Sequence, residues 1–527
     1  MTVPSETRTP NVDLMSLREQ AGLSQQDLAD ELNSLAGRKY GKYPNITKKT
    51  VGRWERGEVE WPQPFYRRLL ADYFTCAVDE LGFRRPRRLS PTSAACSSAE
   101  LLTLVAAPGT LDPRVEQDQR RWRETREMLG GYRRRLAAVA EQLYPEFVVP
   151  GLEKTGIIAH PSWLPAEPVP LRSVVLDLDE HVAPPAVTGS ERESAQVRPL
   201  ASAEQRYQRY SHAMRDLASP RLFENRLCFR VVGVNWTMPV AQLQFGAMCF
   251  FDSIDTNEAL AHEMALHHLS RDNRGDVAVG RASWRRLAFR KLVDDPFDLS
   301  RRPVMGAIGT LTIRGGESPS MVLHQRDGGR VAGGGGMVHL LPAGIFQPSS
   351  VLPGAIAADF SIWRNIQREF SEELLGSAEH DGSGRPIDYA GLEPFVTMDQ
   401  ALLDGRVRVY CLGLTLDALT LCADLLTVAV FEPELYDELF CNSVDTNDEG
   451  AIPVRAVPFE GHTIDRLREA EQLSPGAAAA IHLAWNHRKV ILVDHPDATT
   501  NAGQSSGVSP YISPPASPKF ARPPTQS

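Results

Sequence analysis

Paired cysteines are missing from this chain of 527 residues, because its seven cysteines are scattered and no two form a Cys-x-x-Cys pair. A zinc ribbon or a disulfide framework is therefore not expected. No segment spells a Walker loop, a dinucleotide-binding fingerprint or a nucleophile elbow. The second histidine of a zinc-protease helix must follow the first by four residues, whereas His262 and His267 are five apart. We expect that segment to be a partly exposed polar helix.

Long apolar runs are missing as well. The most apolar stretch, residues 418–431, is too short to span a bilayer and contains Asp424. The first residues, MTVPSETRTPNVDL, are polar and lack the apolar core of a secretory signal. These features predict a cytoplasmic protein that does not contact membranes.

No large excess of either charge is present at the N-terminus, in contrast to the rest of the chain. The whole chain has a net charge of −9, yet residues 1–90 hold 15 basic and 12 acidic residues, so the remainder carries the negative excess. A mildly basic head on an acidic body fits a DNA-binding module joined to a part that does not bind DNA.

Short helices with strong capping signals fill residues 12–83. Ser24 is an N-cap for the helix QQDLADEL, and Thr47 is an N-cap for the helix KKTVGRWERG. On the latter helix Val51 and Trp54 are expected to face a core. The residues expected to face outward are Lys48, Lys49, Thr50 and Arg53.

These motifs resemble the Cro/C1-type (XRE-like) helix-turn-helix, through LREQAGLSQQDLADEL, ITKKTVGRWERG and FYRRLLADYFTCAVDELGF. The resemblance implies double-stranded DNA as partner, with Gln25 touching a phosphate and the outward residues of the third helix facing the major groove. The candidate DNA-binding residues are Gln25, Thr47, Lys48, Lys49, Thr50, Arg53, Arg38, Lys39 and Lys42.

The chain departs from the family between the second and third helices, where NSLAGRKYGKYPN replaces a tight turn. This predicted loop carries Arg38, Lys39 and Lys42, and is either a basic flap on the DNA backbone or a solvated loop. The whole module has one competing interpretation, a helical protein-interaction domain with ordinary surface charges.

A linker is predicted at residues 84–111, followed by a connector helix at 112–145. Apolar residues recur there at alternating spacings of three and four, as in a coiled coil. Either this seam joins two subunits of a homodimer or the helix packs on its own body, and Gly130-Gly131 weakens a long coiled coil. The seam residues are Trp122, Thr125, Leu129, Tyr132, Leu136, Val139 and Leu143.

The remaining sequence predicts an α/β (α+β) body. Residues 146–299 form an accessory region, Pro-rich and then α+β, and residues 300–493 alternate strands and helices. A Pro/Ser-rich tail at 494–527 is expected to be disordered.

Clustered carboxylates mark the segment RNIQREFSEELLG, residues 364–376. On a helix Glu369, Glu372 and Glu373 share one face, and such hard oxygen ligands suit Mg²⁺ or Mn²⁺. The opposite, buried face is predicted to comprise Trp363, Ile366, Phe370 and Leu374.

The same segment resembles the second half of the Nudix box. The resemblance covers residues 300–493 and implies a mixed sheet, a nucleotide or nucleoside-diphosphate-type ligand, metal binding by Glu369, Glu372 and Glu373, and catalysis by Glu372 and Glu373. The first glutamate of the box is absent: its position holds Phe360 if Gly354 is the loop glycine, or Ser350 if Gly344 is.

Together these features predict a multidomain, DNA-binding transcriptional regulator with a Nudix-like nucleotide-sensing body. The alternative is a metal-dependent Nudix-type diphosphohydrolase carrying a DNA-binding appendage. A third interpretation is a scaffold whose body makes only protein contacts.

Overall fold

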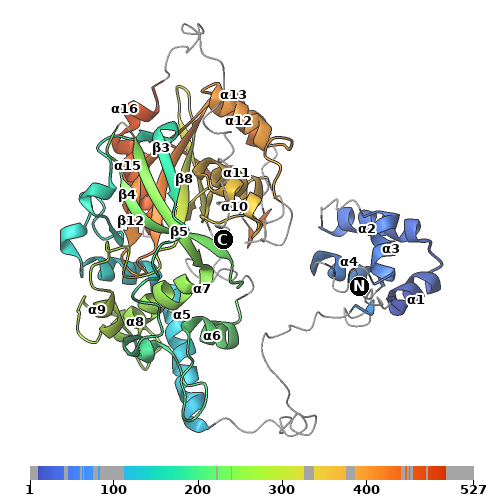
Figure 1. Ribbon diagram of the computed structural model, residues 1–527, viewed down its shortest axis with the longest axis horizontal. Coiled ribbons are helices and arrows are strands. Elements are labelled where there is room, and N and C mark those ends of the chain that lie inside the picture. The colour runs from blue at the N-terminus through green and yellow to red at the C-terminus, as the bar shows by residue number, and fades with distance from the viewer. Residues whose placement is uncertain are drawn as a thin grey trace, which may run out of the picture. The chain divides into compact units, whose positions relative to one another are not determined.

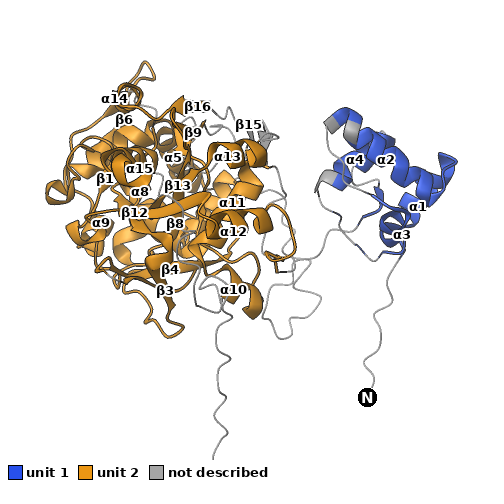
Figure 2. Cartoon of the chain, turned by 90° about the horizontal axis from the view of Figure 1, so that it is seen from above, with its two compact units in different colours: residues 1–109 blue, residues 110–527 orange. Residues whose placement is uncertain are grey.

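The protein forms two compact units, residues 1–109 and 110–527, in a computed structural model (Figure 2). The structure describes residues 10–40, 46–57, 59, 62, 64–74, 81–83, 112–220, 223–238, 240–325, 338–375, 386–440, 446–447, 450–451, 455–469 and 473–493. The predicted linker (residues 84–111), the predicted tail (residues 494–527) and Lys42 lie outside these ranges.

Among its described residues, the first unit contains four helices around one small core. They are α1 (Val12–Gln20), α2 (Gln25–Tyr40), α3 (Lys48–Glu55) and α4 (Pro64–Phe74). Ser24 and Asp27 form a reciprocal capping box at the start of α2, and Thr47 and Thr50 form another at α3. Both predicted caps are confirmed. The core includes Leu14, Leu28, Leu32, Val51 and Trp54.

The helix α2 is longer than predicted. It continues through the supposed loop to Tyr40, so that Arg38 and Lys39 lie in its last turn. The extension has an apolar face, since Leu32 and Ala36 are fully buried one turn apart. The prediction of a loop beginning at Asn33 was therefore wrong.

The second unit begins with the 29-residue helix α5 (Pro113–Glu141), which Asp112 caps and Pro113 starts. It passes through Gly130-Gly131 without a break. Trp122, Leu129 and Leu136 are at most 4% exposed and belong to the large core of this unit. Of the two alternatives, the structure favours packing of the seam on its own body.

A mixed, curled sheet forms the centre of this unit (Figure 1). Its strands run in the order β1-β12-β13-β8-β9-β10, with β11 also on β8, β16 on β9 and β2 on β12. The central strands β13 and β8 are parallel, and β12 is antiparallel to β13. The bounds are β1 (Ile157–Ile158), β2 (Val169–Pro170), β8 (Gly306–Arg314), β9 (Ser320–Gln325), β10 (Val338–Leu340), β11 (Ala343–Ile345), β12 (Val407–Asp417), β13 (Ala423–Phe431) and β16 (Arg455–Pro458).

Both faces of this sheet are buried, which explains the continuous apolar sequence of β13. Leu425, Ala429 and Phe431 face one core, whereas Leu426 and Val428 face the other. The helix α11 (Ile362–Glu373) covers the first face and α15 (Pro475–Asn486) the second (Figure 1). The alternation of strands and helices predicted for residues 300–493 is confirmed by β8, β9, β12, β13 and α15.

A smaller sheet of order β3-β5-β4 and several short elements complete the unit. No helix among the described residues is long and apolar enough to cross a membrane. The strands are β3 (Val174–Leu178), β4 (Leu227–Asn235), β5 (Ala241–Cys249), β6 (Leu269–Arg271), β7 (Val277–Val279), β14 (Thr446–Asn447) and β15 (Gly450–Ala451). The helices are α6 (Tyr210–Ala213), α7 (Phe250–Ser253), α8 (Ala259–His268), α9 (Ala288–Val293), α10 (Pro353–Asp359), α12 (Phe395–Leu403), α13 (Pro433–Phe440), α14 (Gly461–Glu469) and α16 (Arg488–Ile491).

Buried arginines tie the accessory region to the main sheet. Arg290, on α9, donates hydrogen bonds to the carbonyls of Ala418 and Leu419, and Arg302 donates to the carbonyl of Leu421. These carbonyls lie in the turn between β12 and β13. Residues 146–299 and 300–493, predicted as separate parts, therefore share one core and one compact unit.

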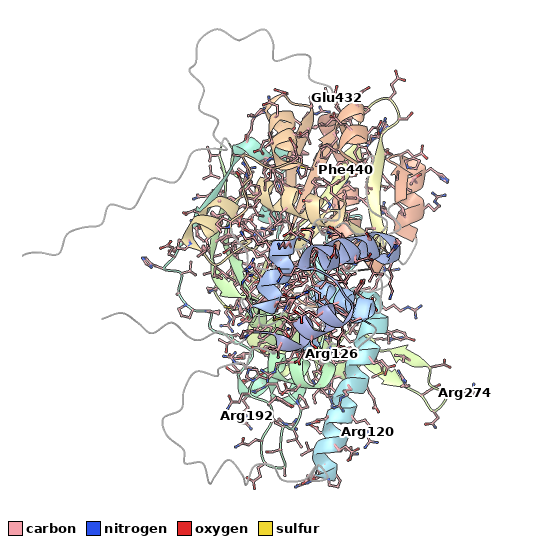
Figure 3. All side chains as sticks on the ribbon, turned by 90° about the vertical axis from the view of Figure 1, so that its right-hand side faces the viewer. Arg120, Arg126, Arg192, Arg274, Glu432 and Phe440 are labelled. Carbon is pink, nitrogen blue, oxygen red and sulfur yellow. The ribbon has the colours of Figure 1, made fainter. Side chains whose placement is uncertain are left out.

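Glu258 fixes α5 to the rest of the unit. It ends a π-helical turn, Ile254–Glu258, and forms ion pairs with Arg126 at 2.8 Å and with Arg133. The Arg126 side chain is 12% exposed, whereas Arg120 on the same helix lies at the surface (Figure 3). Burial alone would raise the pKa of Glu258, but Arg133 and Arg126 together lower it to about 2.

Replacing Glu258 with Gln is expected to destabilise the second unit by about 3–5 kcal/mol, because two buried arginines then lack their counter-ion. Urea unfolding at neutral pH measures this change. Because the pKa of Glu258 is lowered from 4.5 to about 2 by folding, the effect should hold above pH 4.5 and shrink as the pH falls toward 2.

The matched control is Glu127→Gln, also on α5. Its carboxylate is 73% exposed and lies 3.9 Å from Arg271, so the change should cost less than about 1 kcal/mol. Equal stability of the two variants would contradict the assignment of Glu258 as the residue that fixes α5.

Candidate functional site

The helix α3 presents a basic, solvent-facing surface on a buried base. Val51 and Trp54 are at most 3% exposed, whereas Lys48, Lys49 and Arg53 are exposed. Thr47 is exposed as well, and Thr50 is half-buried with its hydroxyl close to that of Thr47. The structure thus brings together all five α3 residues that the sequence predicted for DNA contact.

A buried polar network holds α3 against α1 and the start of α2. The Arg18 guanidinium donates to the Glu55 carboxylate at 2.5 Å and to the Leu23 carbonyl at 2.7 Å. Gln25 donates from its amide to the other carboxylate oxygen of Glu55 at 2.5 Å. Glu55 is 3% exposed, so its charge depends on these partners. Because Arg18 and Glu55 are 37 residues apart, no local pattern in the sequence pointed to this pair.

Gln25, predicted to touch a phosphate, has its side-chain nitrogen on Glu55. It is half-buried at the N-terminus of α2, where the helix dipole favours an anion. The network fixes the position of this amide relative to α3. A phosphate contact by Gln25 remains a prediction.

Of the predicted basic flap, Arg38 and Lys39 are exposed in the last turn of α2. Lys39 forms an ion pair with Asp72 on α4 at 3.0 Å, with its own side chain 52% exposed. This pair links α2 to α4 within the unit, so Lys39 also has a structural role. Lys42 lies outside the described residues.

The acidic helix α11 runs along β11. Asn365 donates to the carbonyl of Ile345 at 3.1 Å, and Glu373 accepts from the amide of Ala343 at 3.1 Å. Between them, the Glu369 carboxylate lies so close to Gly344 that a Cβ there would stand 2.1 Å from it. Residues four apart on one face of α11 thus meet consecutive residues of β11.

Arg368 lies among the other carboxylates and is only 2% exposed. Its guanidinium is 3.5 Å from Glu369 and 3.9 Å from Glu372. Neither Nη1 nor Nη2 has a hydrogen-bond partner among the described residues. Arg368 therefore places a positive charge beside Glu369 and Glu372, two of the three predicted cation ligands.

The predicted Mg²⁺ or Mn²⁺ site does not fit this geometry. Glu373 is turned to β11 and is 6% exposed, whereas Glu372 is turned to Arg368. Within the part of the chain that the structure describes, no three His, Cys, Asp or Glu side chains are grouped to hold a metal ion. We derive no chemical step through a metal.

Neither of the two candidate positions for the missing glutamate holds a carboxylate. Phe360 packs in an aromatic cluster with Phe229, Phe245 and Phe346. Ser350 is 2% exposed. The predicted buried face of α11 is confirmed, since Trp363, Ile366, Phe370 and Leu374 are at most 2% exposed.

A polar network beside α11 escaped sequence analysis. Asp359 accepts hydrogen bonds from Ser349 and from the Tyr389 hydroxyl at 2.6 Å, and it is 1% exposed. The Arg364 guanidinium lies over the Tyr389 ring and pairs with Asp399 at 2.7 Å. Its members come from α10, α11, α12 and residue 389, so only the tertiary fold brings them together.

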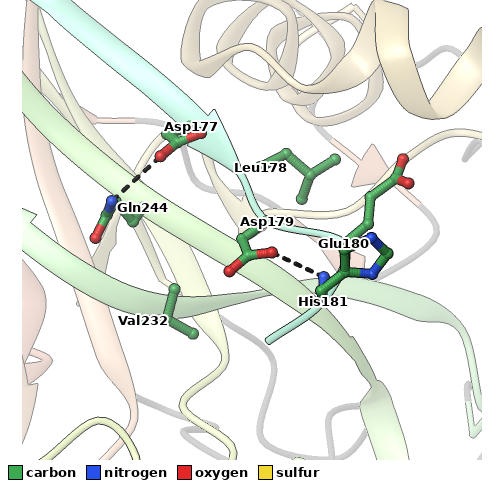
Figure 4. Close-up of a pocket in the computed structure, with 7 residues that line it drawn as sticks. All are labelled: Asp177, Leu178, Asp179, Glu180, His181, Val232 and Gln244. Atoms are coloured by element: carbon green, nitrogen blue, oxygen red, sulfur yellow. Dashed lines mark hydrogen bonds between the residues drawn. The ribbon is translucent and has the colours of Figure 1, made fainter. Parts of the chain in front are cut away.

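An open pocket of about 440 Å³ lies at the end of β3 (Figure 4). Gln244 donates to Asp177 at 3.2 Å, and the amide of His181 donates to Asp179 at 2.8 Å. Glu180 adds a third carboxylate, and Leu178 and Val232 supply the apolar wall. The pocket is acidic and lies on the sheet of β3, β5 and β4, whereas α11 packs on the main sheet.

The histidines of α8 have structural contacts. His262 stacks on Trp122 and hydrogen-bonds Tyr210 at 2.9 Å, and burial lowers its pKa well below the usual value. Glu263 accepts from the amides of Phe289 and Arg290. The helix is buried, so the expectation of a partly exposed polar helix was wrong.

Comparison with models of known protein families and with curated proteins finds no match. Both resemblances therefore rest on the motifs of this chain alone.

Because the Arg368 guanidinium lies 3.5 Å from Glu369 and 3.9 Å from Glu372 and repels a second cation there, millimolar Mg²⁺ or Mn²⁺ is expected to leave the thermal unfolding midpoint unchanged. A site filled at a hundredfold excess over its Kd would add about 2.7 kcal/mol of stability. Differential scanning calorimetry at matched ionic strength measures this. A rise in the midpoint that Glu372→Gln abolishes, but that the exposed control Glu124→Gln keeps, would contradict the expectation.

Proposed function

We propose that this protein is a DNA-binding transcriptional regulator that reads double-stranded DNA with α3. The observation that supports the proposal most is the pairing of two features on this short helix. Lys48, Lys49 and Arg53 are exposed on one face, while Trp54 and Glu55 hold the other face in the unit. A short basic helix on such a base suits insertion into the major groove.

The side chains on and next to α3 differ in the kind of DNA contact that we expect them to make. Lys48 and Lys49 supply salt-dependent affinity through phosphates, and Thr47, Thr50 and Arg53 supply contacts to phosphates or base edges. A protein-interaction domain would not need its outward face to be this basic.

For the second unit we propose a Nudix-like body that binds a nucleotide-type ligand and senses it. The support is the mixed sheet between α11 and α15, together with the Nudix-like sequence of α11. Hydrolysis is the weaker alternative, because the first glutamate of the box is missing and Arg368 lies between Glu369 and Glu372. A ligand changes DNA binding only if its affinity differs between the two states.

The proposed homodimer requires a surface other than the α5 seam. Two-fold operators are read by pairs of helix-turn-helix units, and the seam residues of α5 are buried in their own unit.

The double variant Lys48→Ala/Lys49→Ala tests the proposal. In a salt series with duplexes from the promoter region of its own gene, the variant should bind at least about tenfold more weakly. The slope of log K against log salt should fall in magnitude by about two, one unit for each lost phosphate contact.

The matched control is Lys291→Ala/Lys489→Ala, which removes the same charge from exposed positions on α9 and α16. It should bind like the unmodified protein. If both double variants lose affinity equally, or if the unmodified protein binds no duplex, α3 does not read DNA.

A further inference from the structure

The hairpin formed by β6 and β7 projects beside α5, with Arg274 at its tip (Figure 3). Every residue from Ser270 to Asp276 is exposed. An isolated two-stranded ribbon is only marginally stable in water, so this one depends on its base. Leu269 is 7% exposed in the large core, and Val277 and Val279 pack against that core.

The tip is a well-defined turn. The Asp272 carboxylate accepts from the amides of Arg274 and Asp276, at 2.8 and 2.9 Å. The Asp272 amide donates to the Asp276 carbonyl, and Gly275 adopts a φ of +91°, which favours glycine. Asp272 is thus engaged by the backbone of the turn.

Arginines surround this turn. Arg271 ends β6 and lies 3.9 Å from Glu127 on α5. Arg274 and Arg281 are exposed, and no described residue pairs with either guanidinium. From residue 269 to 286 the sequence has five basic and two acidic residues, in a chain whose net charge is −9. The fold does not use the charge of Arg274 or Arg281.

We propose that the β6–β7 hairpin is a second DNA contact, in which Arg271, Arg274 and Arg281 meet the phosphates or the minor groove of a duplex. This inference rests on the proposed function, and it revises the expectation that the acidic body does not bind DNA. Two-stranded ribbons enter DNA grooves, and arginine suits both phosphates and narrow minor grooves.

The composition of the tip favours a nucleic acid over a membrane. Residues 272–276 read Asp-Asn-Arg-Gly-Asp and include no aromatic or aliphatic side chain that could anchor in lipid. The exposed Asp276 adds repulsion toward any anionic surface, so contact through Arg274 needs the shape of a groove or of a phosphate row.

The test uses the full chain with Arg271→Gln/Arg274→Gln/Arg281→Gln and a labelled duplex of mixed sequence, about 60 base pairs long. The 28 residues between Phe83 and Asp112 can span at most about 95 Å when extended, so this length allows both units to bind. The triple variant should bind at least threefold more weakly, with a salt slope smaller by about three.

The control Arg172→Gln/Arg192→Gln/Arg466→Gln removes the same charge from exposed positions elsewhere and should bind like the unmodified protein. Arg274→Gln alone, whose side chain has no partner to lose, should show the same trend and excludes misfolding as the cause.

Three outcomes would overturn the inference. In the first, the triple variant binds the duplex as tightly as its control does. In the second, the triple variant loses binding only to vesicles that contain phosphatidylserine, which makes the hairpin a membrane contact, and in the third the unmodified protein binds no duplex. If the Lys48→Ala/Lys49→Ala variant loses DNA binding and the triple variant does not, the hairpin contact is contradicted and the proposed function is supported.

If the triple variant loses DNA binding and the Lys48→Ala/Lys49→Ala variant does not, the proposed function is contradicted and the hairpin contact is supported.

Discussion

The ion pairs of Glu258 with Arg126 and Arg133 hold the long helix α5 in place, and much of the second unit depends on that position. Two guanidinium groups pointing into a core are tolerated only because a carboxylate meets them. With α5 fixed, Trp122 stacks on His262 of α8 and donates a hydrogen bond to the Val197 carbonyl. The accessory region and the main sheet consequently form one body.

The same constraint, that buried charge needs a partner, recurs in the first unit. Glu55 ends α3, and Arg18 and Gln25 reach it from α1 and α2. This network fixes the orientation of α3 relative to α1 and α2. The side chains of Lys48, Lys49 and Arg53 are exposed as a result.

Local signals in the sequence predicted local structure well. The caps at Ser24 and Thr47 and the apolar face of α11 depend on residues within one or two turns of each other. The end of α2 was mispredicted because the family resemblance implied a turn where NSLAGRKYGKYPN stands, while Leu32 and Ala36 in fact bury an additional turn against the core.

Contacts between residues that lie far apart in the chain could not be predicted from the sequence. The seam of α5 has the same spacing whether it meets a second chain or α8, and the residue that decides, Glu258, lies more than 120 residues away. The motif of α11 identified three glutamates on one helix face. It did not reveal that β11 would take Glu369 and Glu373, or that Arg368 would turn toward Glu369 and Glu372.

Lysine-reactivity footprinting tests the central claim, that the outward face of α3 contacts DNA, most directly. The chain has only eight lysines, and Lys48 and Lys49 are exposed on α3 while Lys291 and Lys489 are exposed elsewhere. With saturating duplex, acetylation of Lys48 and Lys49 should slow several-fold while that of Lys291 and Lys489 is unchanged. Equal acetylation of all four lysines with and without bound DNA would contradict the account.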